Sequence, residues 1–203
     1  YLTLTNNSNR NATTGTNPAN PRLNNVNGHI IRWHDDAGAN SFRWEIFVFG
    51  ANADADADTN RSGLTALNQL ASPDGIAFDD RGILWIQTDN GIDGGRNNAV
   101  ARTTNDQMLA VVPAALSANT GTGPAVNASN QAELRRFFVG PNEAEITGFG
   151  YTPDHTSIFI NVQHPVNWPA YGTTDASVVP TGEVRPRSST VVIQRADGGP
   201  VGV

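Results

Sequence analysis

Apolar residues along this chain fall in short alternating runs, which are separated by Gly, Pro, Asn and Asp. Runs of this length and period predict β-strands rather than helices. The predicted strands cover residues 1–5, 29–33, 42–49, 75–78, 83–88, 107–112, 133–139, 148–152, 157–162 and 189–195. The best helical periodicity covers residues 64–70. The pattern therefore predicts an all-β protein with at most one short helix.

Two stretches of the chain repeat one scheme. Residues 74–87 and residues 147–161 each read as a short apolar strand, a polar turn and a strand that contains an aromatic residue. Four predicted strands lie between the start of the first copy and the start of the second. Four antiparallel strands make one blade of a β-propeller, so the repeat predicts that blades are the building units.

The strand count predicts a partial β-propeller. The 203 residues would supply between two and three blades of a single domain, in a ring expected to have six. Closed propellers have about four to eight blades, so further chain is needed to complete the ring. Tyr1 already stands inside a predicted strand, and we therefore expect an N-terminal part to be missing. A β-sandwich with similar hairpins is the alternative fold.

Composition narrows the possible functions. The net charge of −6 argues against nonspecific nucleic-acid binding. No apolar run approaches the roughly 18 residues of a membrane span. The chain has no cysteine, which excludes disulfides, thiolate metal sites and a cysteine nucleophile within these residues. The sequence also contains no Gly-x-Ser-x-Gly elbow and no nucleotide-binding glycine loop.

An acidic residue stands at the entrance of the first strand in each repeat copy. Asp74 precedes one strand and Glu145 precedes the other. The first strand of each propeller blade lines the central channel, so such carboxylates would converge at one mouth. Carboxylate oxygens are ligands for Ca²⁺ and other hard cations. For Asp74 a purely structural role stays open, because Pro-Asp-Gly is a common turn.

Other candidate sites are less specific. Residues 54–62 alternate oxygen-bearing side chains as a calcium loop does, but the segment has Thr59 where an EF-hand loop has Gly and Thr65 where it has Glu. We interpret it as a solvated acidic loop. No pair of histidines has the spacing of a zinc helix. His164 stands at a strand end before Pro165, where a role in substrate binding or a structural hydrogen bond is expected.

Several motifs in shared order resemble the PhoX-type alkaline phosphatases, and they cover only the C-terminal portion of such a protein. They are residues 4–7 (LTNN), 20–22 (NPR), 28–31 (GHII), 42–47 (FRWEIF), 71–75 (ASPDG), 84–89 (LWIQTD), 136–141 (RFFVGP), 145–148 (EITG), 161–165 (NVQHP), 185–188 (RPRS) and 197–199 (DGG).

The resemblance implies a propeller that binds Ca²⁺ and Fe³⁺ and hydrolyses phosphate monoesters in the periplasm or outside the cell. It implies metal ligation by Asp74 and Glu145, with Asp89, Asn6 and Asn7 as further ligands or their support. The resemblance also suggests that Arg22 faces the phosphate, and His164 is the second candidate for substrate binding. The iron-binding cysteine of the family would lie upstream of this chain.

The sequence and the resemblance together leave two main functions open. The first is a calcium- and iron-dependent phosphomonoesterase for phosphate acquisition, of which this chain is a fragment completed by a missing N-terminal portion or another chain. The second is a non-catalytic binding or structural module of an extracellular assembly, which the long polar loops favour. A calcium-dependent lactonase is a third option.

Overall fold

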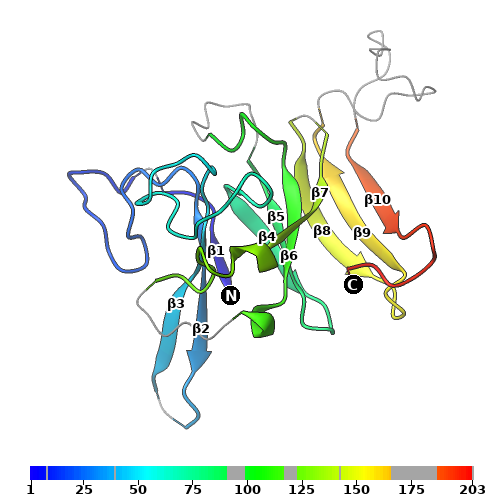
Figure 1. The fold of residues 1–203 in the computed structure, drawn as a ribbon, viewed down its shortest axis with the longest axis horizontal. Helices are drawn as coiled ribbons and strands as arrows, with labels where there is room; N and C mark the ends of the chain where they lie inside the picture. Colours follow the sequence, from blue (N-terminus) through cyan, green and yellow to red (C-terminus); the bar gives the residue numbers. More distant parts are fainter. Residues whose placement is uncertain are drawn as a thin grey trace.

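The computed structural model describes residues 1–7, 9–38, 40–90, 99–116, 123–141, 143–165 and 187–202, and these form ten strands in three antiparallel sheets (Figure 1). The first sheet contains β1 (Leu2–Leu4), β2 (His29–Asp35) and β3 (Phe42–Phe49); the middle sheet contains β4 (Pro73–Phe78), β5 (Leu84–Thr88), β6 (Gln107–Val111) and β7 (Arg135–Val139); and the third contains β8 (Glu145–Tyr151), β9 (Ser157–Gln163) and β10 (Ser189–Gln194). Two short 3-10 turns, η2 (Pro113–Ala115) and η3 (Gln131–Glu133), lie between β6 and β7. The all-β prediction is confirmed.

The helix predicted over residues 64–70 is wrong. This segment forms turns, which are closed by backbone hydrogen bonds from the Asn68 and Gln69 amides to the Thr65 carbonyl oxygen and by asparagine side chains. Asn60 Oδ1 accepts a hydrogen bond from the Leu64 amide at 2.7 Å, and Asn68 Oδ1 accepts one from the Thr65 amide at 2.8 Å. The apolar spacing that imitates a helix instead anchors a loop, whose Leu64 is buried against the first sheet.

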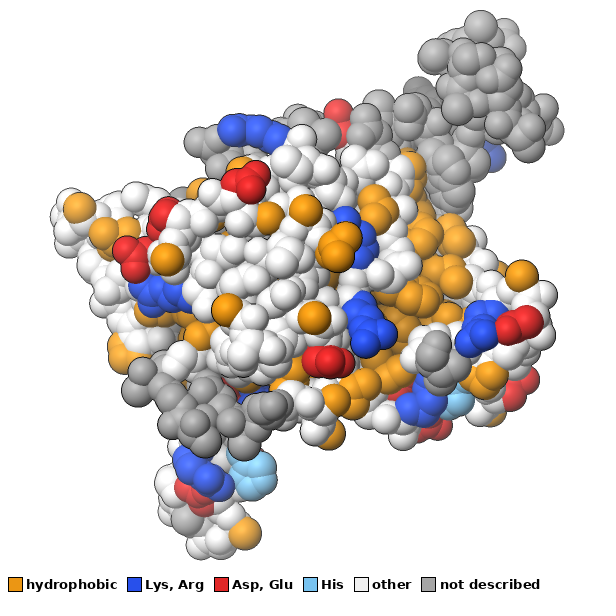
Figure 2. Space-filling model, in the orientation of Figure 1, with side chains coloured by type: hydrophobic (Ala, Val, Ile, Leu, Met, Phe, Trp, Pro, Cys, Tyr) orange, Lys and Arg blue, Asp and Glu red, His pale blue; other side chains and the backbone are white. Residues whose placement is uncertain are grey.

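The middle sheet lies between the other two, and both of its faces are buried. Successive side chains of a strand point to opposite faces. Leu84 and Ile86 of β5 accordingly join a core shared with the first sheet, whereas Trp85 joins a core shared with the third. All five residues of β5 are therefore buried. Hydrophobic side chains gather on the visible face between β7 and the third sheet, along the edge of this second core (Figure 2).

The two copies of the sequence repeat form hairpins with the same local geometry. β4–β5 and β8–β9 each carry a register shift near the start of the first strand. At this shift Gly75 packs under the side chain of Gln87, and Gly148 packs under that of Asn161, with no room for a Cβ at either position. The four-stranded grouping predicted between the copies is confirmed as the middle sheet.

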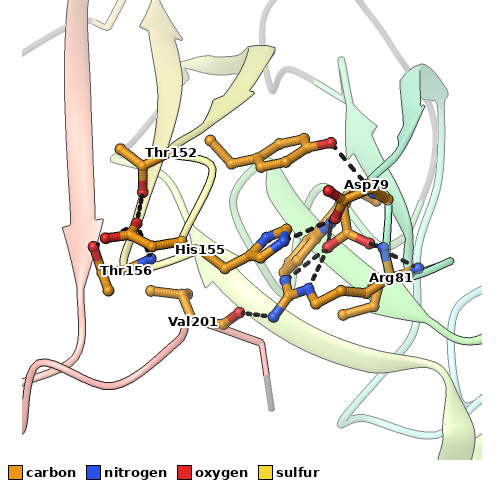
Figure 3. A network of polar contacts seen from close by, with 11 residues as sticks. Asp79, Arg81, Thr152, His155, Thr156 and Val201 are labelled. Carbon is orange, nitrogen blue, oxygen red and sulfur yellow. Dashed lines mark hydrogen bonds and ion pairs between the residues drawn. The ribbon is translucent and has the colours of Figure 1, made fainter.

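A polar network holds the middle and third sheets at a fixed orientation (Figure 3). Arg81, in the β4–β5 turn, contacts Asp79 Oδ2 at 2.7 Å and donates to the carbonyl oxygen of Val201 at 2.8 Å. His155, in the β8–β9 turn, lies 2.8 Å from Asp80, and its carbonyl oxygen accepts a hydrogen bond from the Val201 amide. The network thus joins two hairpin turns and the C-terminal turn.

Within the part of the chain that the structure describes, no helix has the length and apolar character needed to cross a membrane.

Candidate metal centre

Asp74 and Asp89 lie at the same end of the middle sheet. β4 and β5 are antiparallel, and Pro73 at the start of β4 pairs with Thr88 at the end of β5. Asp74 is the second residue of β4, and Asp89 directly follows β5. The Asp89 amide donates to the carbonyl oxygen of Ser72 at 3.0 Å, which ties the end of β5 to the start of β4.

Glu145 and His164 hold the matching places in the third sheet. Glu145 begins β8 and pairs with Gln163, the last residue of β9, and His164 comes next. The Gln163 side chain donates from Nε2 to Glu145 Oε2 at 2.6 Å. His164 Nδ1 lies 3.2 Å from the carbonyl oxygen of Glu143. The repeated hairpins thereby bring their equivalent ends to one region.

Asp89, Glu145 and His164 form a cluster in which one ligand atom from each lies within 4.8 Å of the others. His164 Nε2 lies 3.4 Å from Glu145 Oε2. Ligands about 2.3–2.6 Å from a Ca²⁺ ion can be separated by such distances. Carboxylate oxygens suit Ca²⁺, and a mixed set of oxygens and an imidazole nitrogen also suits iron. The cluster has the donors of a metal site.

The electrostatics of Glu145 favour a cation. Burial raises the pKa of this carboxyl above its ordinary value, and the negative charges of Asp89 and Asp74 raise it further. His164 acts in the opposite direction and lowers it. A buried carboxylate that faces two others is unfavourable until a positive charge joins them. The chemistry of this donor set therefore fits a bound cation.

The backbone around the cluster is held in an unusual conformation. Ser72, Glu143 and His164 have φ values of 49°, 56° and 38°, in the left-handed region that favours glycine. Such a conformation costs roughly 1 kcal/mol or more for each residue and concentrates at functional sites. Each of the three stands beside a candidate ligand or is one, so the strained positions aim the ligands.

Buried polar atoms beside Asp89 add to the candidate site. Within the described residues, Ser72 Oγ and both side-chain atoms of Asn90 are buried without a hydrogen-bond partner. Buried polar groups are normally satisfied by protein, water or a ligand. Asp106 supports this end of β5, because its Oδ1 accepts from the Thr88 hydroxyl and from the Asn90 amide, each at 2.5 Å.

The other residues predicted from the resemblance lie in the N-terminal loop. Asn6 is exposed after β1, while Asn7 pairs with Asn25 and donates from its side chain to Asn20. The Thr3 hydroxyl donates to the carbonyl oxygen of Asp74, so β1 ends near the start of β4. The roles predicted for Asn6 and Asn7 stay predictions.

Arg22 is buried, and its guanidinium is engaged within the chain. It donates hydrogen bonds to the carbonyl oxygens of Gly50, Thr59 and Gly28 and to Asn25 Oδ1, at 2.6–2.8 Å. Burial, followed by the charge of Arg61, lowers its pKa to about 10. These contacts give Arg22 a structural role, and its role toward phosphate stays a prediction.

Sequence reasoning missed Gln163 and Asp106 as support for the cluster, and considered His164 for substrate binding or a structural hydrogen bond but not as a metal ligand. Pairing across strands was the available signal, because Gln163 can be aligned with Glu145 once the β8–β9 hairpin is placed. The acidic loop at residues 54–62 is explained by its own turns, in which Asp56 accepts from the amides of Asp58 and Thr59.

Comparisons with known proteins agree with the resemblance. A family model described as alkaline phosphatase PhoX matches residues 1–166. A search of curated proteins gives no significant match. Among solved structures, Pseudomonas fluorescens PhoX in complex with vanadate, a transition state analogue, is similar with a TM-score of 0.72 and 36% identity, over 98% of this chain and 32% of that chain. This chain thus spans about a third of that protein, and it belongs to the PhoX alkaline phosphatase family.

Proposed function

We propose that this chain is part of a metal-dependent phosphomonoesterase of the PhoX type that uses calcium and iron. The observation that carries the proposal is the convergence of Asp89, Glu145 and His164, with Asp74 near enough to raise the Glu145 pKa. A protein with net charge −6 repels phosphate esters. Cations at this cluster would therefore bring the substrate and the acidic protein together.

The residues of this chain act by holding and aiming oxygen donors. Gln163 fixes one carboxylate oxygen of Glu145, and the Ser72 carbonyl holds the backbone of Asp89. When bound, hard cations would neutralise phosphate charge and lower the pKa of a water molecule. No serine or cysteine nucleophile would then be needed.

We further propose that the three sheets are blades of a six-bladed β-propeller and that residues 1–203 are its C-terminal part. This chain covers 32% of the similar PhoX chain, which is therefore about three times as long as this one. The missing N-terminal portion, or another chain, would supply the remaining metal ligands. Asn6 and Asn7 are proposed as support for these ligands, and Arg22 is proposed to face the phosphate.

We propose that the whole protein acts in the periplasm or outside the cell, where phosphate-ester hydrolysis would serve phosphate acquisition. This location is part of the proposal. Localisation is tested by fractionating cells and following the protein with an antibody.

The activity is tested on the complete gene product with an aryl phosphate as substrate. We expect hydrolysis that is lost after treatment with a strong chelator and restored by calcium and iron, together with both metals in elemental analysis. Glu145→Gln should lower the metal content and the rate, while the exposed control Glu133→Gln should change neither. Full activity after exhaustive metal removal would contradict the proposal.

The same experiment separates the alternatives. Hydrolysis of lactones but not of phosphates would indicate a lactonase. A folded gene product that binds no metal and hydrolyses neither substrate would indicate a non-catalytic module.

A further inference from the structure

A pocket of about 420 Å³ lies between the N-terminal loop and the loop that follows β3. It is lined by residues of 16–27 on one side and of 58–61 on the other, and none of them belongs to the candidate metal cluster. The Asn27 carbonyl oxygen accepts a hydrogen bond from the Ser72 amide at 2.9 Å, and the Ser72 carbonyl oxygen accepts one from the Asp89 amide at 3.0 Å. Two backbone hydrogen bonds thus connect the pocket with the cluster, but the pocket is a separate site.

Two guanidinium groups meet at one aromatic ring beside this pocket. The Cζ atoms of Arg22 and Arg61 lie 4.7 and 5.5 Å from the centre of the Phe49 ring. Burial, followed by the positive charge of Arg61, lowers the pKa of Arg22 to about 10. Within the described residues, neither guanidinium forms an ion pair with a carboxylate. The two like charges therefore repel each other, and a bound anion would relieve the repulsion.

Arg61 has the available hydrogen-bond donors of this pair. The residue is exposed, and its Nε donates to the carbonyl oxygen of Asp58 at 2.9 Å. Its two terminal nitrogens form no hydrogen bond in the part of the chain that the structure describes. Arg22 differs, because four oxygen atoms of the chain accept hydrogen bonds from its terminal nitrogens. Arg61 can therefore bind a ligand through two parallel hydrogen bonds, while Arg22 adds a fixed positive charge nearby.

Asn27 adds a buried amide to the wall of the pocket. The residue is 8% exposed, and no described residue gives its buried Oδ1 atom a hydrogen bond. Buried polar groups normally have a partner. A half-turn of the amide exchanges its oxygen and nitrogen, so this position can also donate to an anion. The unpartnered amide is thus a second, independent indication of a ligand.

The charges around the pocket favour an anion. Arg22 and Arg61 are opposed by Asp58, the one acidic residue among the described residues of the lining. This local excess of positive charge contrasts with the net charge of −6 of the whole chain. An anion would be repelled by most of the protein and attracted here.

We propose that the pocket binds a phosphate-type oxyanion, held by the terminal nitrogens of Arg61 and the amide of Asn27 next to the fixed charge of Arg22. A guanidinium matches the geometry of phosphate oxygens and binds them in a bidentate manner. The ligand is inorganic phosphate or the phosphate group of a larger molecule, which present the same oxygens. This site is additional to any phosphate at the metal centre, and the proposal does not depend on the phosphatase activity.

Titration of the complete gene product with inorganic phosphate at low ionic strength tests the proposal, with isothermal titration calorimetry as the measurement. Arg61→Gln removes the proposed anchor at an exposed position, and Asn27→Ala is the second variant. Arg43→Gln removes an arginine whose side chain is 77% exposed and serves as the control. Glu145→Gln disables the candidate metal centre, which separates phosphate bound there from phosphate bound in the pocket. Circular dichroism melting identifies any variant that fails to fold, and the other variant then decides.

We expect Arg61→Gln and Asn27→Ala to weaken one class of phosphate sites by about tenfold or more, and Arg43→Gln by less than about twofold. This class should persist in Glu145→Gln. Phosphate binding that Arg61→Gln leaves unchanged would overturn the proposal, as is expected if a carboxylate from outside residues 1–203 occupies the pocket. Loss of all phosphate binding in Glu145→Gln would overturn it in favour of the metal centre alone. Phosphate binding in the pocket of a protein without phosphatase activity would contradict only the proposed function.

Phenylphosphonate, which a phosphatase cannot hydrolyse, identifies the source of the phosphate group. If the pocket takes the phosphate group of a larger molecule, phenylphosphonate should bind within about threefold of inorganic phosphate and depend equally on Arg61. If the pocket takes the free ion, phenylphosphonate should bind about tenfold or more weakly. Binding of neither probe in the pocket would overturn the proposal.

Discussion

Two carboxylates of this chain show how surroundings decide the behaviour of a side chain. Burial and neighbouring carboxylates raise the pKa of Glu145. Burial acts in the same direction on Asp79, but hydrogen bonds from Arg81, the Ile83 amide and the Trp85 indole outweigh it and hold the Asp79 pKa below its ordinary value. Asp79 therefore stabilises the fold when ionised, whereas ionised Glu145 strains it until a cation binds.

Glu145→Gln should stabilise the metal-free chain at neutral pH, by an amount on the order of 1 kcal/mol, because it removes the repulsion from Asp89 and Asp74. The same change should reduce the rise in Tm that calcium chloride produces, because a ligand is lost. Differential scanning calorimetry with and without calcium measures both effects. Glu133→Gln is the matched control, and an equal calcium response in all three proteins would contradict the assignment of Glu145 as a ligand.

Asp79→Asn should lower the free energy of unfolding by about 2 kcal/mol at pH 7, because Arg81 and Trp85 lose a buried charged partner. Because the Asp79 pKa is lowered in the folded state, ionised Asp79 contributes its full stabilisation above the unfolded-state pKa of about 3.9. This contribution is lost as the pH falls through the folded-state pKa. The difference in the free energy of unfolding between the wild type and the variant should therefore shrink as the pH is lowered. Urea titrations between neutral and acid pH measure it, with Asp197→Asn in an exposed pair as a weaker control.

At the scale of elements, the repeated hairpin is the unit that places the candidate ligands. Each hairpin has a glycine packed beneath an amide side chain at its register shift, Gly75 under Gln87 and Gly148 under Asn161. The shift allows the strand to start at the cluster and still direct its later residues into the core. The two hairpins are thus equivalent in geometry although only scattered residues are identical.

Gly148→Ala should destabilise the protein by about 1–2 kcal/mol, because the backbone has a φ of 64° and a Cβ would push aside the end of the Asn161 side chain. Gly82→Ala is a matched control, since Gly82 has a φ of 82° but nothing within 4 Å of a Cβ. This control should lose about 1 kcal/mol from backbone strain. Chemical denaturation compares the two, and equal losses would show that the packing beneath Asn161 contributes nothing.

At the scale of the molecule, two cores share the middle sheet. Leu84 packs in the core toward the first sheet, and its neighbour Trp85 packs in the core toward the third sheet. The contacts of Asp79 with Arg81 and of Asp80 with His155 add a polar connection between the middle and third sheets (Figure 3). The two interfaces can therefore be weakened independently.

Trp85→Ala should lower the free energy of unfolding by about 3–5 kcal/mol, and the third sheet should be the part that is destabilised. Hydrogen exchange should accelerate in β8 and β9, while β2 and β3 keep most of their protection. Leu84→Ala is the reciprocal variant, with acceleration expected in β2 and β3. Exchange that rises uniformly in both variants would mean that the three sheets unfold as one unit.

Much of this architecture was predictable, because strands and turns are local features. Alternation located every strand, and the echo between residues 74–87 and 147–161 located the middle sheet. Local pattern failed at residues 64–70, which form hydrogen-bonded turns in place of a helix. Asp74 and Glu145 could be proposed because each stands at a strand entrance.

The amino-acid sequence by itself determined the strand pattern, which rests on residues close together in the chain, and the order of its motifs carried the family resemblance. It also pointed to Asp74 and Glu145 as candidate ligands, because each stands at a strand entrance. Tertiary structure alone decided that His164 joins Asp89 and Glu145 and that Gln163 holds Glu145. It also decided which face of each strand is covered, so that Trp85 is buried while Phe159 is open. These features join residues far apart in sequence, and only the packing of one sheet against another sets the distances between them.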